Sequence, residues 1–132
     1  MHLIRWHVFR ESISEAIKIT PDAYFEIASQ VGIRPNFLEA DLGTEALSVW
    51  QQKTAYYLQL AVSGEFPKRF RHPQFRVLVI ANTERRLANI RSTVAKSTGK
   101  IFWFTTFESL NREGFWSPVW LRPAGDQRHS LI

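Results

Sequence analysis

The sequence predicts an α/β protein with one mixed β-sheet flanked by helices. Strand-like and helical segments alternate along most of the chain, which is typical of this fold class. The apolar run at residues 77–80 is typical of a strand that is covered on both faces. Two strand-like segments precede the first long helix, so we expect antiparallel and parallel pairing within the same sheet.

Local signals set the expected limits of the elements. Pro21 disfavours helix in the residue before it, so any turn or helix that precedes it must end there. The first long helix is predicted to begin after an N-cap at Thr44 and to stop at Gly64. The second is predicted to begin after Asn82 or Thr83. In chain order we expect a strand at residues 3–9, a turn or helix at 12–18, strands at 22–27 and 37–42, a helix at 44–63, a basic loop at 66–73, a strand at 75–81, a helix at 83–96, a strand at 101–105, a helical turn at 108–112, a short strand at 119–121 and a loose tail at 122–132.

Length and composition favour one globular domain over residues 1–132, which could also be the C-terminal part of a longer protein. Hydrophobic residues make up 45% of the chain and charged residues 22%, which is ordinary for such a domain. The absence of cysteine excludes disulfides and cysteine nucleophiles, and it fits a reducing cytoplasm. The sequence has no apolar segment of membrane-spanning length and no signal peptide, so we expect a cytoplasmic protein without a membrane partner.

Charge is distributed unevenly between the two halves of the chain. Residues 1–66 contain five Lys or Arg and eight Asp or Glu, whereas residues 67–132 contain twelve and four, so the net charges are −3 and +8. A basic half suits a protein that binds a polyanion such as DNA. The alternative is that both halves are solvated surface and that the asymmetry is accidental.

Three acidic residues, Asp22, Glu39 and Asp41, fall on two neighbouring predicted strands. Side chains two residues apart share a strand face, so Glu39 and Asp41 stand together, and an antiparallel hairpin would bring Asp22 to them. Mg²⁺ and Mn²⁺ prefer such oxygen ligands, so we expect these three carboxylates to form a metal site. The alternative is that the strands simply have one solvated face.

Lys53 lies on the apolar stripe of the first long helix, between Trp50 and Tyr57. A lysine at such a position usually extends its ammonium group out of the core edge into solvent. This helix, however, follows directly after the strand that carries Glu39. If it folds back over the sheet, Lys53 would return to the carboxylates, where it could steady a phosphate or an attacking hydroxide.

The basic segment after the first long helix is the main candidate for nucleic-acid contacts. It contains Lys68, Arg69 and Arg71 interleaved with Phe70, an arrangement that suits phosphate contacts and stacking on bases. Further along, Arg85 and Arg86 could add charge from the start of the second long helix. The alternative, a solvated basic face, fits the sequence equally well.

The C-terminal part is rich in aromatic residues, including Trp103, Trp116 and Trp120. Such residues are more often part of a core or an interface than a platform for stacking bases. A homodimer built on this part of the chain is therefore a further possibility.

The acidic motifs resemble those of the PD-(D/E)xK nuclease superfamily. Pro21-Asp22 matches the first motif and Glu39-Ala40-Asp41 occupies the second, with Asp41 where the family pattern has lysine. Some members carry that lysine on the neighbouring helix, and Lys53 would be the migrated residue. The resemblance implies a restriction-endonuclease-like fold. It also implies a catalytic set of Asp22, Glu39, Asp41 and Lys53.

Residues 21–91 more closely resemble the replication-relaxation family of plasmid-associated bacterial proteins. The resemblance rests on four ordered motifs: PDAYFEI, FLEADLGTE, KTAYY and VLVIANTERR. It implies a DNA-related role on plasmids or other mobile elements. Members often have a winged-helix DNA-binding region upstream, so this chain could be a C-terminal fragment or a shortened relative.

Two functions follow from these expectations. The first is a Mg²⁺- or Mn²⁺-dependent DNA endonuclease, in which bound water attacks the phosphorus and Lys53 orients it. The second is a DNA-binding or assembly module that has kept the fold and lost the chemistry. Asp41 at the lysine position favours the second, whereas the presence of three acids together with Lys53 favours the first.

Overall fold

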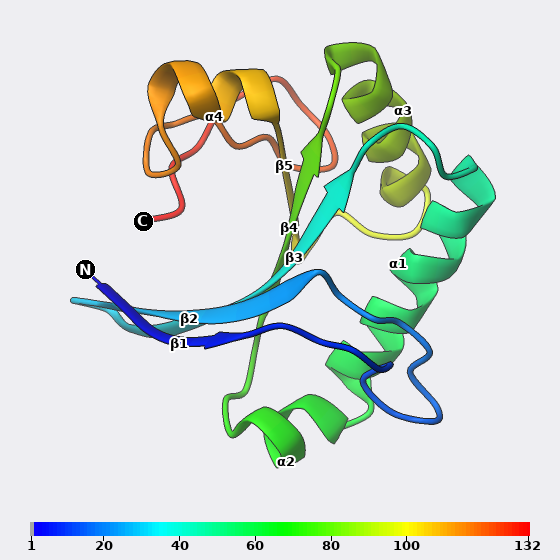
Figure 1. The fold of residues 1–132 in the computed structure, drawn as a ribbon, viewed down its shortest axis with the longest axis vertical. Helices are drawn as coiled ribbons and strands as arrows, with labels where there is room; N and C mark the ends of the chain where they lie inside the picture. Colours follow the sequence, from blue (N-terminus) through cyan, green and yellow to red (C-terminus); the bar gives the residue numbers. More distant parts are fainter. Residues whose placement is uncertain (1) are drawn as a thin grey trace.

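The computed structural model describes residues 2–132, which form a five-stranded mixed sheet with helices on both faces (Figure 1). The strands lie side by side in chain order, from β1 to β5. The first three pair in antiparallel fashion and the last three in parallel, so the predicted mixed α/β sheet is confirmed. The strands are β1 (His2–His7), β2 (Ala23–Ser29), β3 (Gly32–Asp41), β4 (Arg76–Ala81) and β5 (Phe102–Thr106). The helices are α1 (Leu47–Val62), α2 (Glu65–Phe70), α3 (Glu84–Ala95) and α4 (Phe107–Glu113).

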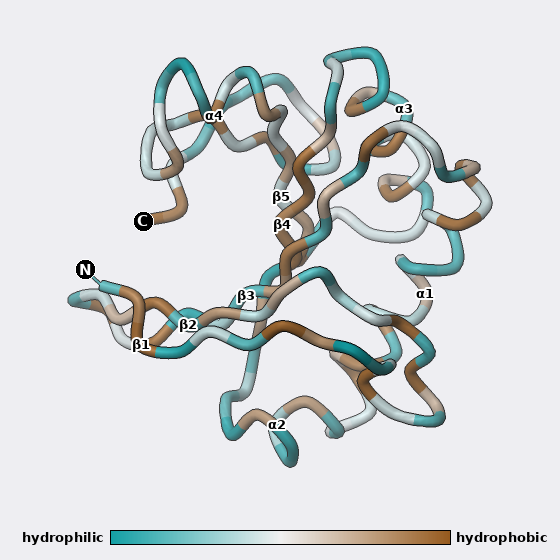
Figure 2. Tube along the Cα trace, in the orientation of Figure 1, coloured by the Kyte–Doolittle hydropathy of each residue, from teal (hydrophilic) through white to brown (hydrophobic). Residues whose placement is uncertain are grey.

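The sheet separates two hydrophobic cores, because side chains of β3 and β4 alternate between its faces. On one face Phe37, Val77 and Val79 pack against α1, α2 and α3. On the other face Leu78 and Ile80 pack against α4 and the C-terminal segment. Figure 2 shows the resulting apolar colour along β4 at the centre of the molecule. The prediction that residues 77–80 form a strand covered on both faces is confirmed.

The helix limits agree with the sequence signals in two places and differ in one. Thr83 caps α3, and its side chain accepts a hydrogen bond from the amide of Arg86 at 3.1 Å, as predicted. Gly64 follows α1 with φ +79°, a conformation that glycine adopts without steric cost. Thr44 is not a cap, because α1 begins only at Leu47 and its N-cap residue, Ala46, makes no side-chain hydrogen bond.

The segment predicted as a basic loop at residues 66–73 contains the short helix α2. Phe66 and Phe70, four residues apart, are both buried in the core on the α1 side of the sheet. Pro67 is tolerated because it lies in the first turn, where the missing N–H has no helical acceptor. Helical spacing brings both aromatic rings into the core, so this segment forms a helix despite its proline.

The C-terminal segment is packed against the sheet, and the expected loose tail at residues 122–132 is not observed. Leu131 is 1% exposed, and its carbonyl accepts a hydrogen bond from Arg76 Nη1 at 2.7 Å. Trp120 is buried and forms an isolated bridge with His129, while Leu121 forms one with Phe104 in place of the predicted strand. Throughout residues 2–132, no helix combines the length and apolar character that crossing a membrane would demand.

Candidate functional site

The candidate site lies where α1 crosses the face of β3. Glu39 and Asp41 both point to this face and are almost fully buried, with 2% and 1% of their surface exposed. Carboxylates at such depth must find hydrogen-bond or ionic partners, because an unpaired buried charge is strongly destabilising. The partners come from α1 and α3.

Glu39 is held by two side chains of α1. Its Oε1 lies 3.1 Å from Lys53 Nζ, and its Oε2 accepts a hydrogen bond of 2.5 Å from the Tyr57 hydroxyl. Lys53 also pairs with Glu45 at 2.9 Å, and its ammonium lies 4.8 Å from the centre of the Trp50 ring. The helix therefore does return Lys53 to the sheet, at a position where 19% of its side chain is exposed.

The electrostatics of this pair are dominated by burial. Burial raises the pKa of Glu39 above its usual value, and this outweighs the opposing effects of Lys53 and Tyr57. Burial acts to lower the pKa of Lys53, but the charges of Glu39 and Glu45 raise it overall. Ionisation of Glu39 therefore lowers the free energy of unfolding. Titratable groups with pKa values shifted in this way are concentrated at functional sites.

Asp22 lies next to this pair at the surface. Its Oδ2 accepts a hydrogen bond of 2.7 Å from the amide of Ala40, and its own amide donates to the carbonyl of Leu38. Leu38 and Ala40 are the residues on either side of Glu39, so Asp22 lies beside Glu39, directly before the neighbouring strand, and its charge adds to the raised pKa of Glu39. Asp22 is thus the exposed member of a group that also contains Glu39 and Lys53.

Asp41 belongs to a separate hydrogen-bond network. Its Oδ1 accepts from Arg86 Nε at 2.8 Å and from the amide of Gly43 at 2.8 Å. Its Oδ2 accepts from Arg86 Nη2 at 2.9 Å and from the Trp50 indole at 2.8 Å. Burial would raise the pKa of Asp41, but these hydrogen bonds lower it overall. Asp41 therefore anchors α1 and α3 to the end of β3.

The expected metal site of Asp22, Glu39 and Asp41 is not formed. Within residues 2–132 no group of three or more His, Cys, Asp or Glu side chains is arranged to hold a metal ion. The physical reason is that Asp41 accepts two hydrogen bonds on each oxygen and has no lone pair left for a metal ion, while each oxygen of Glu39 has one partner on α1. These residues do not fit Mg²⁺ or Mn²⁺ in this arrangement, because such ions require several free oxygen ligands.

The basic residues predicted to contact DNA fall into two groups. Lys68 and Arg69 lie in the last turn of α2, with Arg71 just beyond it, and all three are exposed, as is Arg85. Across the described part of the chain, none of these four residues forms an ion pair with an acid. Arg86 differs, since its guanidinium group is occupied by Asp41 and by the carbonyl of Glu45.

Tyr57 and Glu45 are site residues that the sequence did not reveal. Tyr57 looked like a core aromatic because it lies on the apolar stripe of α1, and the position of its hydroxyl group depends on how the helix packs. Glu45 lies in the segment that was expected to be the first turn of the helix. Their roles become visible only once α1 is seen to begin at Leu47 and to cross β3.

Comparisons with known proteins gave one match. A family model described as replication-relaxation matches residues 1–71, which include Asp22, Glu39, Asp41 and Lys53. Searches of curated proteins and of solved structures found no match.

Asp41→Ala is expected to lower the free energy of unfolding by about 3 kcal/mol, because it leaves the largely buried Arg86 without its partner. Asp22→Ala is the matched control, since it removes an exposed carboxylate that accepts one backbone hydrogen bond and should cost about 1 kcal/mol. Urea denaturation at neutral pH measures both values. Equal stabilities of the two variants would contradict the anchoring role of Asp41.

The two buried carboxylates should respond to pH with opposite signs. The lowered pKa of Asp41 gives stability that is present above its unfolded pKa of ~3.9 and is lost as the pH falls. The raised pKa of Glu39 gives stability that is present below its unfolded pKa of ~4.3 and is lost as the pH rises. Relative to wild type, Asp41→Asn should therefore be most destabilising at neutral pH, whereas Glu39→Gln should gain stability as the pH rises from about 4 to about 7.

Urea denaturation of wild type, Asp41→Asn and Glu39→Gln from about pH 2 to about pH 7 gives the comparison, because the contribution of Asp41 changes below ~3.9 and that of Glu39 changes above ~4.3. Each variant serves as the control for the other, because both remove one carboxylate from the same strand. Curves that shift in the same direction with pH would contradict the two assignments.

Proposed function

The chain belongs to the replication-relaxation family, and on that premise we propose that it is a DNA-associated protein of plasmid or mobile-element replication, acting as a binding or assembly module. In this proposal residues 1–132 are one restriction-endonuclease-like domain. The observation that carries the proposal is the engagement of every oxygen of Glu39 and Asp41 by groups of the protein itself. A nuclease centre needs such oxygens free to hold its metal.

The resemblance to PD-(D/E)xK nucleases supports the fold part of the proposal. Pro21-Asp22 leads into β2, Glu39 lies in β3, and Lys53 reaches Glu39 from the helix that follows. Activity does not follow from a fold, however, and a nuclease fold without a working metal centre can still bind DNA.

Charge supports the association with DNA. The half of the chain that starts at residue 67 has a net charge of +8, and Lys68, Arg69, Arg71 and Arg85 present their charges at the surface. Phosphate contacts from such residues supply most of the non-specific affinity of proteins for DNA. The positive surface charge would therefore hold the domain on DNA without base-specific contacts.

A second candidate function is a DNA endonuclease, and one observation favours it. Lys53 Nζ lies 3.1 Å from Glu39, with Asp22 close by, which is the group of side chains that the nuclease resemblance implies. This function would require Glu39 to release its partners on α1. Asp41 would have no direct part in it, because it is bound to Arg86.

DNA binding should depend on the basic residues of α2. Lys68→Gln/Arg69→Gln is expected to weaken binding to a short duplex and to reduce the slope of log affinity against log salt by about 0.9 for each phosphate that the variant no longer neutralises. The matched control is Arg112→Gln/Arg128→Gln, because both arginines are exposed but paired with Glu113. Fluorescence anisotropy over a series of salt concentrations measures the slopes, and equal slopes for the two variants would remove α2 from the DNA-binding surface.

Cleavage separates the two candidate functions. With supercoiled plasmid and Mg²⁺ or Mn²⁺, we expect no cutting by wild type, Glu39→Ala or Lys53→Ala. Agarose gel electrophoresis detects conversion to nicked or linear forms. Cutting by wild type that is abolished in both folded variants would overturn the module proposal and establish the endonuclease.

A further inference from the structure

A group of arginines lies on the face of the sheet opposite the candidate site. Arg76 is the first residue of β4 and pairs in register with Asn36 of β3, and Arg34 lies two residues before Asn36 on the same strand face. Arg122 approaches from the C-terminal segment. We call Arg34, Arg76 and Arg122 the arginine cluster. It lies at the starts of the parallel strands, whereas Asp41 lies at the end of β3.

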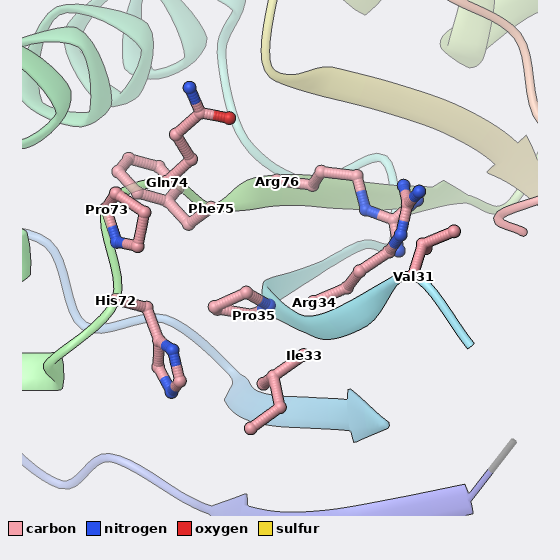
Figure 3. A pocket seen from close by; sticks show the side chains of 9 residues that line it. All are labelled: Val31, Ile33, Arg34, Pro35, His72, Pro73, Gln74, Phe75 and Arg76. Atoms are coloured by element: carbon pink, nitrogen blue, oxygen red, sulfur yellow. The ribbon is translucent and has the colours of Figure 1, made fainter. Parts of the chain in front are cut away.

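The three side chains converge. Figure 3 shows the side chains of Arg34 and Arg76 running toward each other, so that their guanidinium groups lie together. Arg76 and Arg122 both lie against Trp103 of β5, with guanidinium carbons 5.3 Å and 4.5 Å from the ring centre. One tryptophan thus holds two of the three cations in place.

The cluster has hydrogen-bond donors that the protein leaves unused. Arg76 donates through Nε to Asn36 at 2.9 Å and through Nη1 to the carbonyl of Leu131, but its buried Nη2 has no acceptor within residues 2–132. The buried Nε of Arg122 also has none there. Buried donors are almost always paired, with protein groups, water or a bound ligand, so two unpaired donors in one cluster mark a place where water or an anion can be accepted.

Charge leads to the same conclusion. In the described part of the chain, no acidic side chain forms an ion pair with Arg34, Arg76 or Arg122. Burial lowers the pKa of Arg76 to about 10, and repulsion from Arg34 and Arg122 adds to this effect. Like charges held together without an acid create a strong local field for an anion.

The cluster also opens to solvent. A cavity of about 320 Å³ is lined by Arg34, His72 and Arg76, among others (Figure 3). A second, of about 440 Å³, is lined by Arg76, Lys100, Trp103 and Arg122. Both share the segment from Pro73 to Arg76, so an anion could reach Arg76 from either side.

We propose that the arginine cluster binds a phosphate group, and that this is a backbone phosphate of DNA. The planar guanidinium fork matches phosphate oxygens, and converging forks hold one phosphate through several charge-assisted hydrogen bonds. The DNA part of this inference rests on the proposed function, whereas the phosphate site stands on the cluster alone. It would be a second contact with DNA, on the face of the sheet opposite α2.

The test compares Arg34→Gln/Arg122→Gln with Lys18→Gln/Lys96→Gln, which removes two exposed charges that line neither cavity. Arg76 is left intact because it holds Asn36 and Leu131. Inorganic phosphate is titrated against chloride at constant ionic strength, and thermal unfolding is followed by circular dichroism. Phosphate should raise the melting temperature of wild type and of the lysine control, and at least fivefold more phosphate should be needed in the arginine variant.

An equal phosphate response in the two variants, or none in wild type, would overturn the site. If the double variant is unfolded in chloride, Arg34→Gln replaces it, because no hydrogen bond of the Arg34 side chain occurs in the described residues. Salt titrations of duplex DNA binding identify the source of the phosphate, with a slope expected to fall by about 0.9 in the arginine variant, because the cluster holds one phosphate. A phosphate response without any DNA binding by wild type would refute the proposed function and the DNA assignment, while the phosphate site would stand.

Discussion

Two carboxylates buried on one strand face are bound by side chains of the two helices that pack on this sheet. Glu39 and Asp41 point from β3 into a core where an unpaired charge would be strongly destabilising, so each requires a cation from a neighbouring helix. Lys53 of α1 meets Glu39, and Arg86 of α3 meets Asp41. The two pairs connect both helices to the same strand, and Asp41, with two hydrogen bonds on each oxygen, has no lone pair left for a metal ion.

Helix α1 connects these two pairs. Trp50 donates its indole N–H to Asp41, Lys53 pairs with Glu39, and the hydroxyl of Tyr57 binds the other oxygen of Glu39. These residues lie three and four positions apart, so they share one helix face. A single stripe of α1 therefore supplies both apolar cover and polar partners, and movement of this helix would disturb both carboxylates together.

The sequence predicted the mixed sheet because strand patterns follow from local alternation. It left two positions open for Lys53, in solvent or at the carboxylates, and the packing of α1 over β3 decides between them. It did not predict the partner of Asp41, since Arg86 is forty-five residues away and was equally suited to a DNA contact. Helix α2 was missed because the need to bury Phe66 and Phe70 outweighed the proline signal. The pairing of Tyr57 with Glu39 depends on side-chain placement that residue spacing does not encode.

Glu39 and Asp41 and the arginine cluster lie on opposite faces of one sheet. Every oxygen of the two carboxylates has a partner within the protein, whereas Arg76 Nη2 and Arg122 Nε have no acceptor within residues 2–132. We propose that Glu39 and Asp41 do not hold a metal ion, and calorimetric titration of the wild-type protein with Mn²⁺ tests this most directly. No saturable binding is expected at millimolar Mn²⁺. A one-site isotherm that disappears in both Asp22→Asn and Glu39→Gln would contradict this proposal.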